Sequence, residues 1–147
     1  MLNDSRHSIY DYLYGLFYET VTPNVYLASE PQELTNSDMR EGFVVLNVGD
    51  LVDESEFAGQ AFGGARCFVR AFTPAMSRGR MDDEKYAAFE SAINAVIKEA
   101  SANRNADYFI QEDSVLSYDD TDTLDQQTPF YILIKSFIVI TDKQLET

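Results

Sequence analysis

The sequence is poor in the residues that carry most metal and nucleophile chemistry, because its 147 residues include one cysteine, one histidine and no tryptophan. A lone cysteine cannot form a disulfide within the chain, and a zinc site built from Cys and His ligands is excluded in the same way. His7 is far from Cys67 in the sequence, so no local base activates the thiol. Cys67 lies in an apolar run, 67–69, and we expect a small buried residue in a reducing compartment.

Basic residues are also scarce, since 11 Lys and Arg stand against 25 Asp and Glu and leave a net charge of −14. Nucleic acids and anionic membrane surfaces are themselves negative, so neither is expected as a main partner. No stretch approaches the run of about 20 apolar residues that crosses a bilayer, and the N-terminal segment has no signal-peptide pattern. We therefore expect a cytoplasmic protein.

Motifs of catalysis are missing as well. There is no Gly-x-Ser-x-Gly elbow and no Walker loop, and the glycines at 59–64 lack the strand-then-helix setting of a dinucleotide site. The carboxylates of 119–125 bunch as in calcium loops but lack the glycine and the final glutamate of an EF-hand, so we interpret them as a solvated turn and leave cation binding open. We expect no enzyme, no catalytic or metal-binding residues and no cofactor, with an unrecognised carboxylate site as the enzymatic alternative.

The chain is nevertheless well supplied for a core, since 45% of its residues are hydrophobic and 13% are aromatic. No linker, repeat or low-complexity tract divides it, so we expect a single domain over 1–147. Its first element is predicted to be a helix capped by Asp4 or Ser5 and stopped at 22–24. The apolar residues that recur there at helical spacing are Ile9, Tyr10, Leu13, Tyr14, Phe17 and Val21.

Strands are predicted at 25–28, 43–48 and 66–73, with a polar loop over 30–41 and a long, mobile connection over 50–64. The clearest helix spans 83–101, after Asp82 or Asp83 as its cap. Its apolar stripe consists of Tyr86, Phe89, Ile93, Val96, Ile97 and Ala100. Such a stripe buries itself on a sheet.

After this helix we predict short strands at 108–110 and 115–117, joined through 111–113, then an acidic turn over 119–127 and a long apolar strand over 130–140. Because strands flank one principal helix instead of alternating with helices, the predicted class is α+β. The sheet is expected to be mostly antiparallel and covered by the main helix (83–101) together with the N-terminal helix. The final strand is apolar on both faces, so either the N-terminal helix or another subunit must cover its second face.

The strand at 66–73 is predicted to place Cys67, Val69 and Ala71 on one face. Arginines alternate with aromatic residues on the other face, and two more arginines follow shortly after the strand. This pattern predicts a surface that is partly exposed or faces a partner. The candidate interface residues are Arg66, Phe68, Arg70, Phe72, Arg78 and Arg80.

The order of elements resembles the tail terminator and minor tail proteins of long-tailed bacteriophages, which join head and tail. The likeness lies in helices at about 8–20 and 83–101 and strands at 43–48, 66–73 and 130–141. Most of it is carried by the segment from Cys67 to Pro74, continued through a glycine-containing loop into 82–86. The resemblance implies a non-enzymatic subunit that forms a ring, commonly a hexamer, at the head-proximal end of a tail.

We therefore expect a structural assembly protein of a phage or prophage tail, whose partners are copies of itself and other tail or head-connector proteins. In a ring, the four arginines are expected to face acidic segments of the next subunit, at 50–56 or 119–125, with further contacts in the loop 53–64. The alternative is a cytoplasmic adaptor or regulatory module that binds one protein partner.

Overall fold

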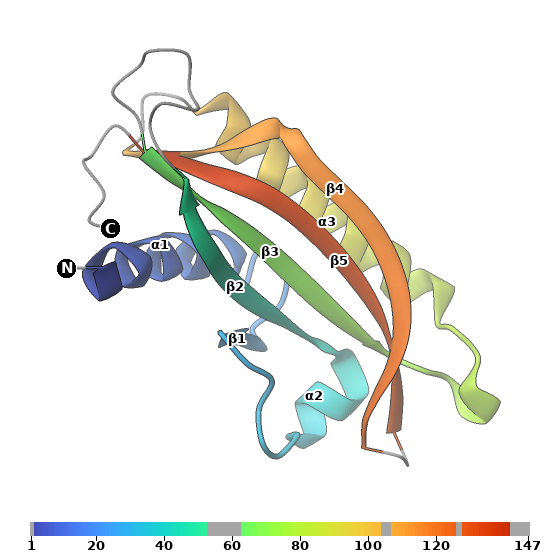
Figure 1. Cartoon of the computed structure of the whole chain (residues 1–147). Coiled ribbons are helices and arrows are strands. Elements are labelled where there is room, and N and C mark those ends of the chain that lie inside the picture. Colours follow the sequence, from blue (N-terminus) through green and yellow to red (C-terminus); the bar gives the residue numbers. More distant parts are fainter. Residues whose placement is uncertain (1, 53–62, 104–106, 126–127, 142–147) are drawn as a thin grey trace.

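The computed structural model describes residues 2–52, 63–103, 107–125 and 128–141. In this part of the chain one five-stranded sheet carries helices α1 (Leu2–Phe17) and α3 (Asp83–Ala102) on the same face (Figure 1). The strands are β1 (Val25–Leu27), β2 (Phe43–Val52), β3 (Gly63–Pro74), β4 (Tyr108–Asp125) and β5 (Thr128–Thr141). They lie in the order β1-β2-β3-β5-β4, and only the β1–β2 contact is parallel. The predicted α+β class with a mostly antiparallel sheet is confirmed.

Helix α3 forms where its sequence predicts it. The Asp82 side chain accepts a hydrogen bond from the Lys85 backbone N–H at 3.2 Å, and acidic residues in the first turn favour the positive end of the helix dipole. The predicted stripe faces the sheet, with Tyr86 partly buried at its edge. Its fully packed members are Phe89, Ile93, Val96, Ile97 and Ala100.

The main core lies between the sheet and the two long helices. From α1 it receives Ile9, Leu13 and Phe17, which have no exposed surface. The predicted alternation of β3 is confirmed, because Cys67, Val69 and Ala71 all point into this core. The strand residues that complete it are Val44, Leu46, Val48, Ala65, Ile110, Leu133, Phe137 and Val139.

The second face of the sheet is covered at one end by the segment that leads from β1 to β2. Leu34 of this segment and Tyr26 of β1 pack there on a cluster of five buried residues, Phe43, Val45, Phe72, Phe130 and Ile132. The prediction that α1 covers this face is wrong, because α1 shares the opposite face with α3. Cover by another subunit stays a prediction.

Two boundaries near the N-terminus differ from the prediction. Helix α1 begins at Leu2, before either predicted cap, and ends at Phe17. Glu19 then adopts a positive φ of 62° and donates its N–H to the Thr22 carbonyl, which turns the chain earlier than 22–24. The predicted loop over 30–41 contains α2 (Asn36–Glu41), held at its start by reciprocal hydrogen bonds between Thr35 and Asp38.

Strand β4 also corrects the prediction. The two short strands are one strand of 18 residues, with an irregular register against β5 between Gln111 and Leu116. The predicted acidic turn is wrong for 119–125, whose backbone pairs with β5 as part of β4, while 126–127 lie outside the described residues. Part of the predicted connection, 53–62, lies outside them too.

None of the helices described is both long and apolar enough to cross a membrane.

Candidate functional site

The predicted interface residues of β3 share the sheet face that the long helices leave uncovered. Arg70 stands opposite Val45 of β2 and Ile134 of β5, and Phe68 stands opposite Asn47 and Ser136. Arg66 is exposed, whereas Phe68 and Arg70 are half-buried. The structure therefore brings these three side chains onto one surface, as the alternation predicts.

The Arg70 side chain already has hydrogen-bond partners within its own chain. Its Nη1 lies 2.7 Å from Glu30 Oε1 and its Nη2 lies 3.2 Å from Asn47 Oδ1. The guanidinium carbon also lies 5.7 Å from the centre of the Phe72 ring, within range of a cation–π contact. These contacts tie the segment after β1 to the sheet, so Arg70 has a structural role before any partner binds.

Phe72 is the one candidate that the structure removes. It has no exposed surface and stacks on Phe43, with ring centres 4.5 Å apart. A side chain buried in its own subunit offers no area to another, so Phe72 belongs to the core.

Arg78 and Arg80 lie in the connection from β3 to α3, around the short 3-10 helix η2 (Ser77–Gly79). Both side chains are exposed, and in the described part of the chain neither has an ion-pair or hydrogen-bond partner. The loop itself is well held. The Met76 N–H donates to the Arg80 carbonyl at 2.6 Å, and the Tyr131 hydroxyl of β5 donates to the Gly79 carbonyl at 2.6 Å.

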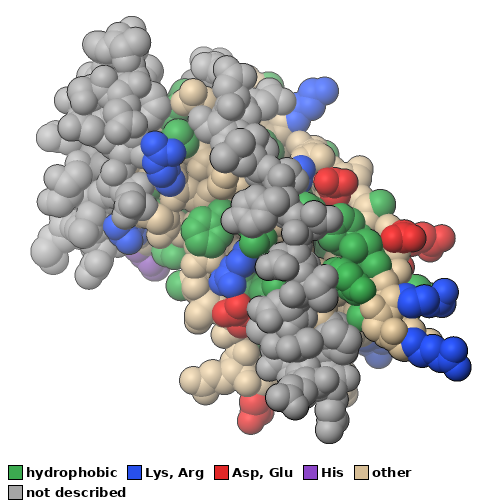
Figure 2. Space-filling view, turned by 45° about the vertical axis from the view of Figure 1, so that its right-hand side comes forward, with side chains coloured by type: hydrophobic (Ala, Val, Ile, Leu, Met, Phe, Trp, Pro, Cys, Tyr) green, Lys and Arg blue, Asp and Glu red, His purple; other side chains and the backbone are tan. Residues whose placement is uncertain are grey.

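The acidic segments predicted to face these arginines are only partly described. Asp50 belongs to β2, and 53–56 lie outside the described residues. Residues 119–125 form the C-terminal part of β4, which is an edge strand of the sheet. In Figure 2 the Lys and Arg side chains are scattered over the visible surface, not gathered in a stripe.

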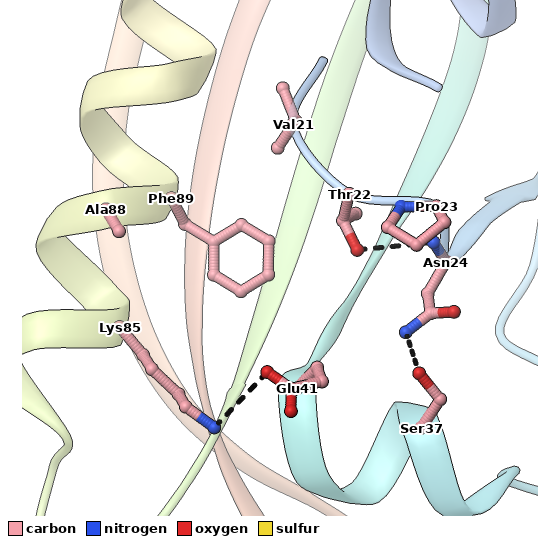
Figure 3. Close-up of a pocket in the computed structure, with 9 residues that line it drawn as sticks. All are labelled: Val21, Thr22, Pro23, Asn24, Ser37, Glu41, Lys85, Ala88 and Phe89. Atoms are coloured by element: carbon pink, nitrogen blue, oxygen red, sulfur yellow. Dashed lines mark hydrogen bonds and ion pairs between the residues drawn. The ribbon is translucent and has the colours of Figure 1, made fainter. Parts of the chain in front are cut away.

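A pocket of about 310 Å³ lies where the segment before β1, helix α2 and the start of α3 meet (Figure 3). Its polar side chains pair with one another across the opening. Lys85 Nζ lies 3.9 Å from Glu41 Oε2 and donates to the Arg40 carbonyl. Asn24 Nδ2 donates to Ser37 Oγ and to the Gly42 carbonyl, each at 3.0 Å. These bonds join three separate segments, and we assign the pocket residues a structural role.

Cys67 is buried, as the sequence predicts. Cys67 is 1% exposed, and burial raises the pKa of its thiol to about 12, so the thiolate that reacts with electrophiles is suppressed at neutral pH. His7 is exposed on α1, where its Nε2 lies 3.5 Å from Asp11 Oδ2. In the described part of the chain no three His, Cys, Asp or Glu side chains gather as metal ligands do.

One exposed feature escaped the sequence prediction. Tyr14 is predicted to be an apolar position of the first helix by its spacing, yet it is 36% exposed, and Tyr18, which follows the end of α1, is 40% exposed. Their rings stack on the outside of the fold with centres 5.1 Å apart. The signal was present in the spacing, because His7, Asp11 and Tyr14 lie on one face of α1 at intervals of four and three residues. Tyr18 follows four residues later, just after the helix ends.

No protein-family model matches the chain, and no curated protein sequence is found to match it.

Proposed function

We propose that this chain is a structural assembly protein of a phage or prophage tail, a ring-forming tail terminator or head–tail joining component. The element order supports the proposal. An N-terminal helix, strands β2 and β3, a sheet-covering helix α3 and a closing strand β5 are the elements on which the resemblance to those proteins is based.

The observation that supports the assembly part of the proposal is that Arg78 and Arg80 are exposed and have no side-chain partner in the described part of the chain. The chain has 25 acidic residues for 11 basic ones, so carboxylates that can pair with an arginine are abundant. Even so, both arginines project from a well-held loop with no partner in the described part of the chain. Two copies that each carry a net charge of −14 repel each other overall, so the proposed attraction is local and comes from pairing of these two arginines with an acidic surface of the neighbouring copy.

The test is the solution mass of the purified protein, measured by light scattering after size exclusion over a range of concentrations and salt. We expect a closed oligomer whose mass is a fixed multiple of the 16.6 kDa chain, and rings of uniform diameter by negative-stain electron microscopy. A mass of one chain at every concentration up to the solubility limit contradicts self-assembly. That result favours the adaptor alternative, in which the same surface binds a different protein.

A further inference from the structure

The basic corner, defined as Met76, Arg78 and Arg80, is a preorganised surface. Met76 is 45% exposed beside the two arginines. Hydrogen bonds at both ends of the loop fix its backbone, including the one from Tyr131 on β5. Side chains that stand on a fixed backbone lose less conformational entropy when a partner binds, which favours recognition.

Arg78 adopts a conformation that has an energetic cost. Its φ of 65° and ψ of 23° lie in the left-handed region, which residues with a Cβ atom seldom occupy. Strain of this kind persists where surrounding contacts impose it, often at binding sites. Glycine, the residue suited to this conformation, stands at the next position, Gly79.

The tyrosine stripe, defined as His7, Asp11, Tyr14 and Tyr18, is a second exposed surface of opposite character. It presents two stacked aromatic rings and the Asp11 carboxylate, whose side chain is 67% exposed. Tyrosine is enriched in the central residues of protein interfaces, because a large rigid ring is buried there at low entropic cost. Arginine is the cation that stacks best on such rings while pairing with a nearby carboxylate.

We propose that the basic corner of one copy docks on the tyrosine stripe of the next, with Arg78 and Arg80 against the Tyr14 and Tyr18 rings and Asp11. Met76 supplies a sulfur–aromatic contact at the same place. This inference rests on the proposed function, since it names the contact by which the copies assemble.

The position of the two surfaces makes the contact intermolecular. Figure 1 shows α1 on the left and the turn between β3 and α3 at the lower right, so the corner and the stripe of one chain lie apart. Two different surfaces that bind each other form a head-to-tail interface, which generates a closed ring or an open filament. Each copy then has one donor surface and one acceptor surface.

A mixing experiment tests this arrangement. The corner variant is Arg78→Glu/Arg80→Glu, and the stripe variant is Tyr14→Ser/Tyr18→Ser. We expect each variant alone to have the mass of one chain. The equimolar mixture is expected to form a dimer and nothing larger, because one intact corner and one intact stripe remain. The matched control is Arg40→Glu/Lys98→Glu, which changes the net charge by the same amount at exposed positions elsewhere and is expected to assemble as the wild type does.

A second corner variant distinguishes loss of the contact from misfolding of the loop. Arg78→Gly/Arg80→Gln removes both guanidinium groups while giving position 78 the residue that its φ favours, so folding should be retained and assembly lost. If the wild type assembles and both corner variants assemble equally well, the corner–stripe contact is wrong and the proposed function stands. If the wild type does not assemble at any concentration, both proposals fail together.

Discussion

Three glycine-to-alanine substitutions separate backbone strain from steric conflict in this fold. Gly42 joins α2 to β2 with φ 90° and ψ 178°, a region that only glycine occupies readily. A Cβ atom there would lie 2.5 Å from the Phe72 carbonyl oxygen and 2.9 Å from the Phe89 ring, both inside the packed core. Gly79 has a positive φ of 73° with open space around it, and Gly15 of α1 has open space and ordinary helical geometry.

The expected order of stability follows from these differences. Strain at Gly42 costs about 1–3 kcal/mol, and forced displacement of packed atoms costs about 1–3 kcal/mol more, so Gly42→Ala should lower the free energy of unfolding by roughly 2–6 kcal/mol. Gly79→Ala carries only the backbone cost of about 1 kcal/mol. Gly15→Ala should raise stability by about 0.5–1 kcal/mol, because alanine favours the helix.

The assay is urea unfolding followed by circular dichroism, with all four proteins at one concentration because assembly adds to apparent stability. Each 1 kcal/mol corresponds to about 2–4 °C in the melting temperature of a chain of this size, so thermal melts resolve the series as well. A Gly42→Ala protein within about 0.5 kcal/mol of the wild type would refute the reasoning. So would a Gly15→Ala protein that loses as much as Gly42→Ala, since that site has neither strain nor contact.

Three further predictions concern polar groups in or beside the core, namely the Lys135–Glu90 pair, Cys67 and Tyr26. The Lys135 side chain is 6% exposed and lies 3.9 Å from half-exposed Glu90, so Lys135→Met should leave the urea midpoint unchanged or raised, whereas Glu90→Ala should lower stability by about 1 kcal/mol. Because burial raises the pKa of Cys67 to about 12, the native thiol should resist a disulfide reagent at pH 8 and react in urea. The stability that the buried neutral thiol contributes to the fold is lost as pH rises from about 9 toward 12. Burial and the hydrogen bond to Asp38 raise the pKa of Tyr26 to about 12. Tyr26→Phe should therefore destabilise the fold near pH 8 and reduce the loss of stability between pH 10 and pH 12, as measured by urea unfolding at pH 8, 10 and 12.

The elements predicted correctly are those whose signal is local. Helix α3 has a complete apolar stripe and a capping aspartate within its own sequence, and β5 is apolar on both faces except near its ends and at Lys135 and Ser136. Helix α2 is too short for periodicity to reveal it, and its one signal was Thr35 three residues before Asp38. Residues 119–125 are polar and acidic, and they form a strand because β5, which follows closely in the sequence, pairs with them. The cause therefore lies in the partner strand and not in their own composition.

For the candidate site too, the features predicted correctly are those that depend on a segment's own sequence. The alternation of β3 correctly places Arg66, Phe68 and Arg70 together, because the period of a strand is fixed. The sequence cannot show that Arg70 is paired with Glu30, 40 residues earlier, or that Phe72 lies under the segment after β1. Exposure of Tyr14 and Tyr18 depends on which side of α1 meets the sheet, and Ile9, Leu13 and Phe17 determine that side once the fold exists.

The two edges of the sheet bear on the proposal that copies of the chain assemble. An exposed edge strand is a template for pairing with another chain, and charged residues at the edge oppose such pairing. One edge is β1, which is three residues long, and the other is β4, whose sequence carries Asp119, Asp120, Asp122 and Asp125. Two such acidic strands repel each other at short range. Pairing of β4 with β4 of another copy is therefore disfavoured, and the contact proposed above uses side-chain surfaces instead, the basic corner and the tyrosine stripe.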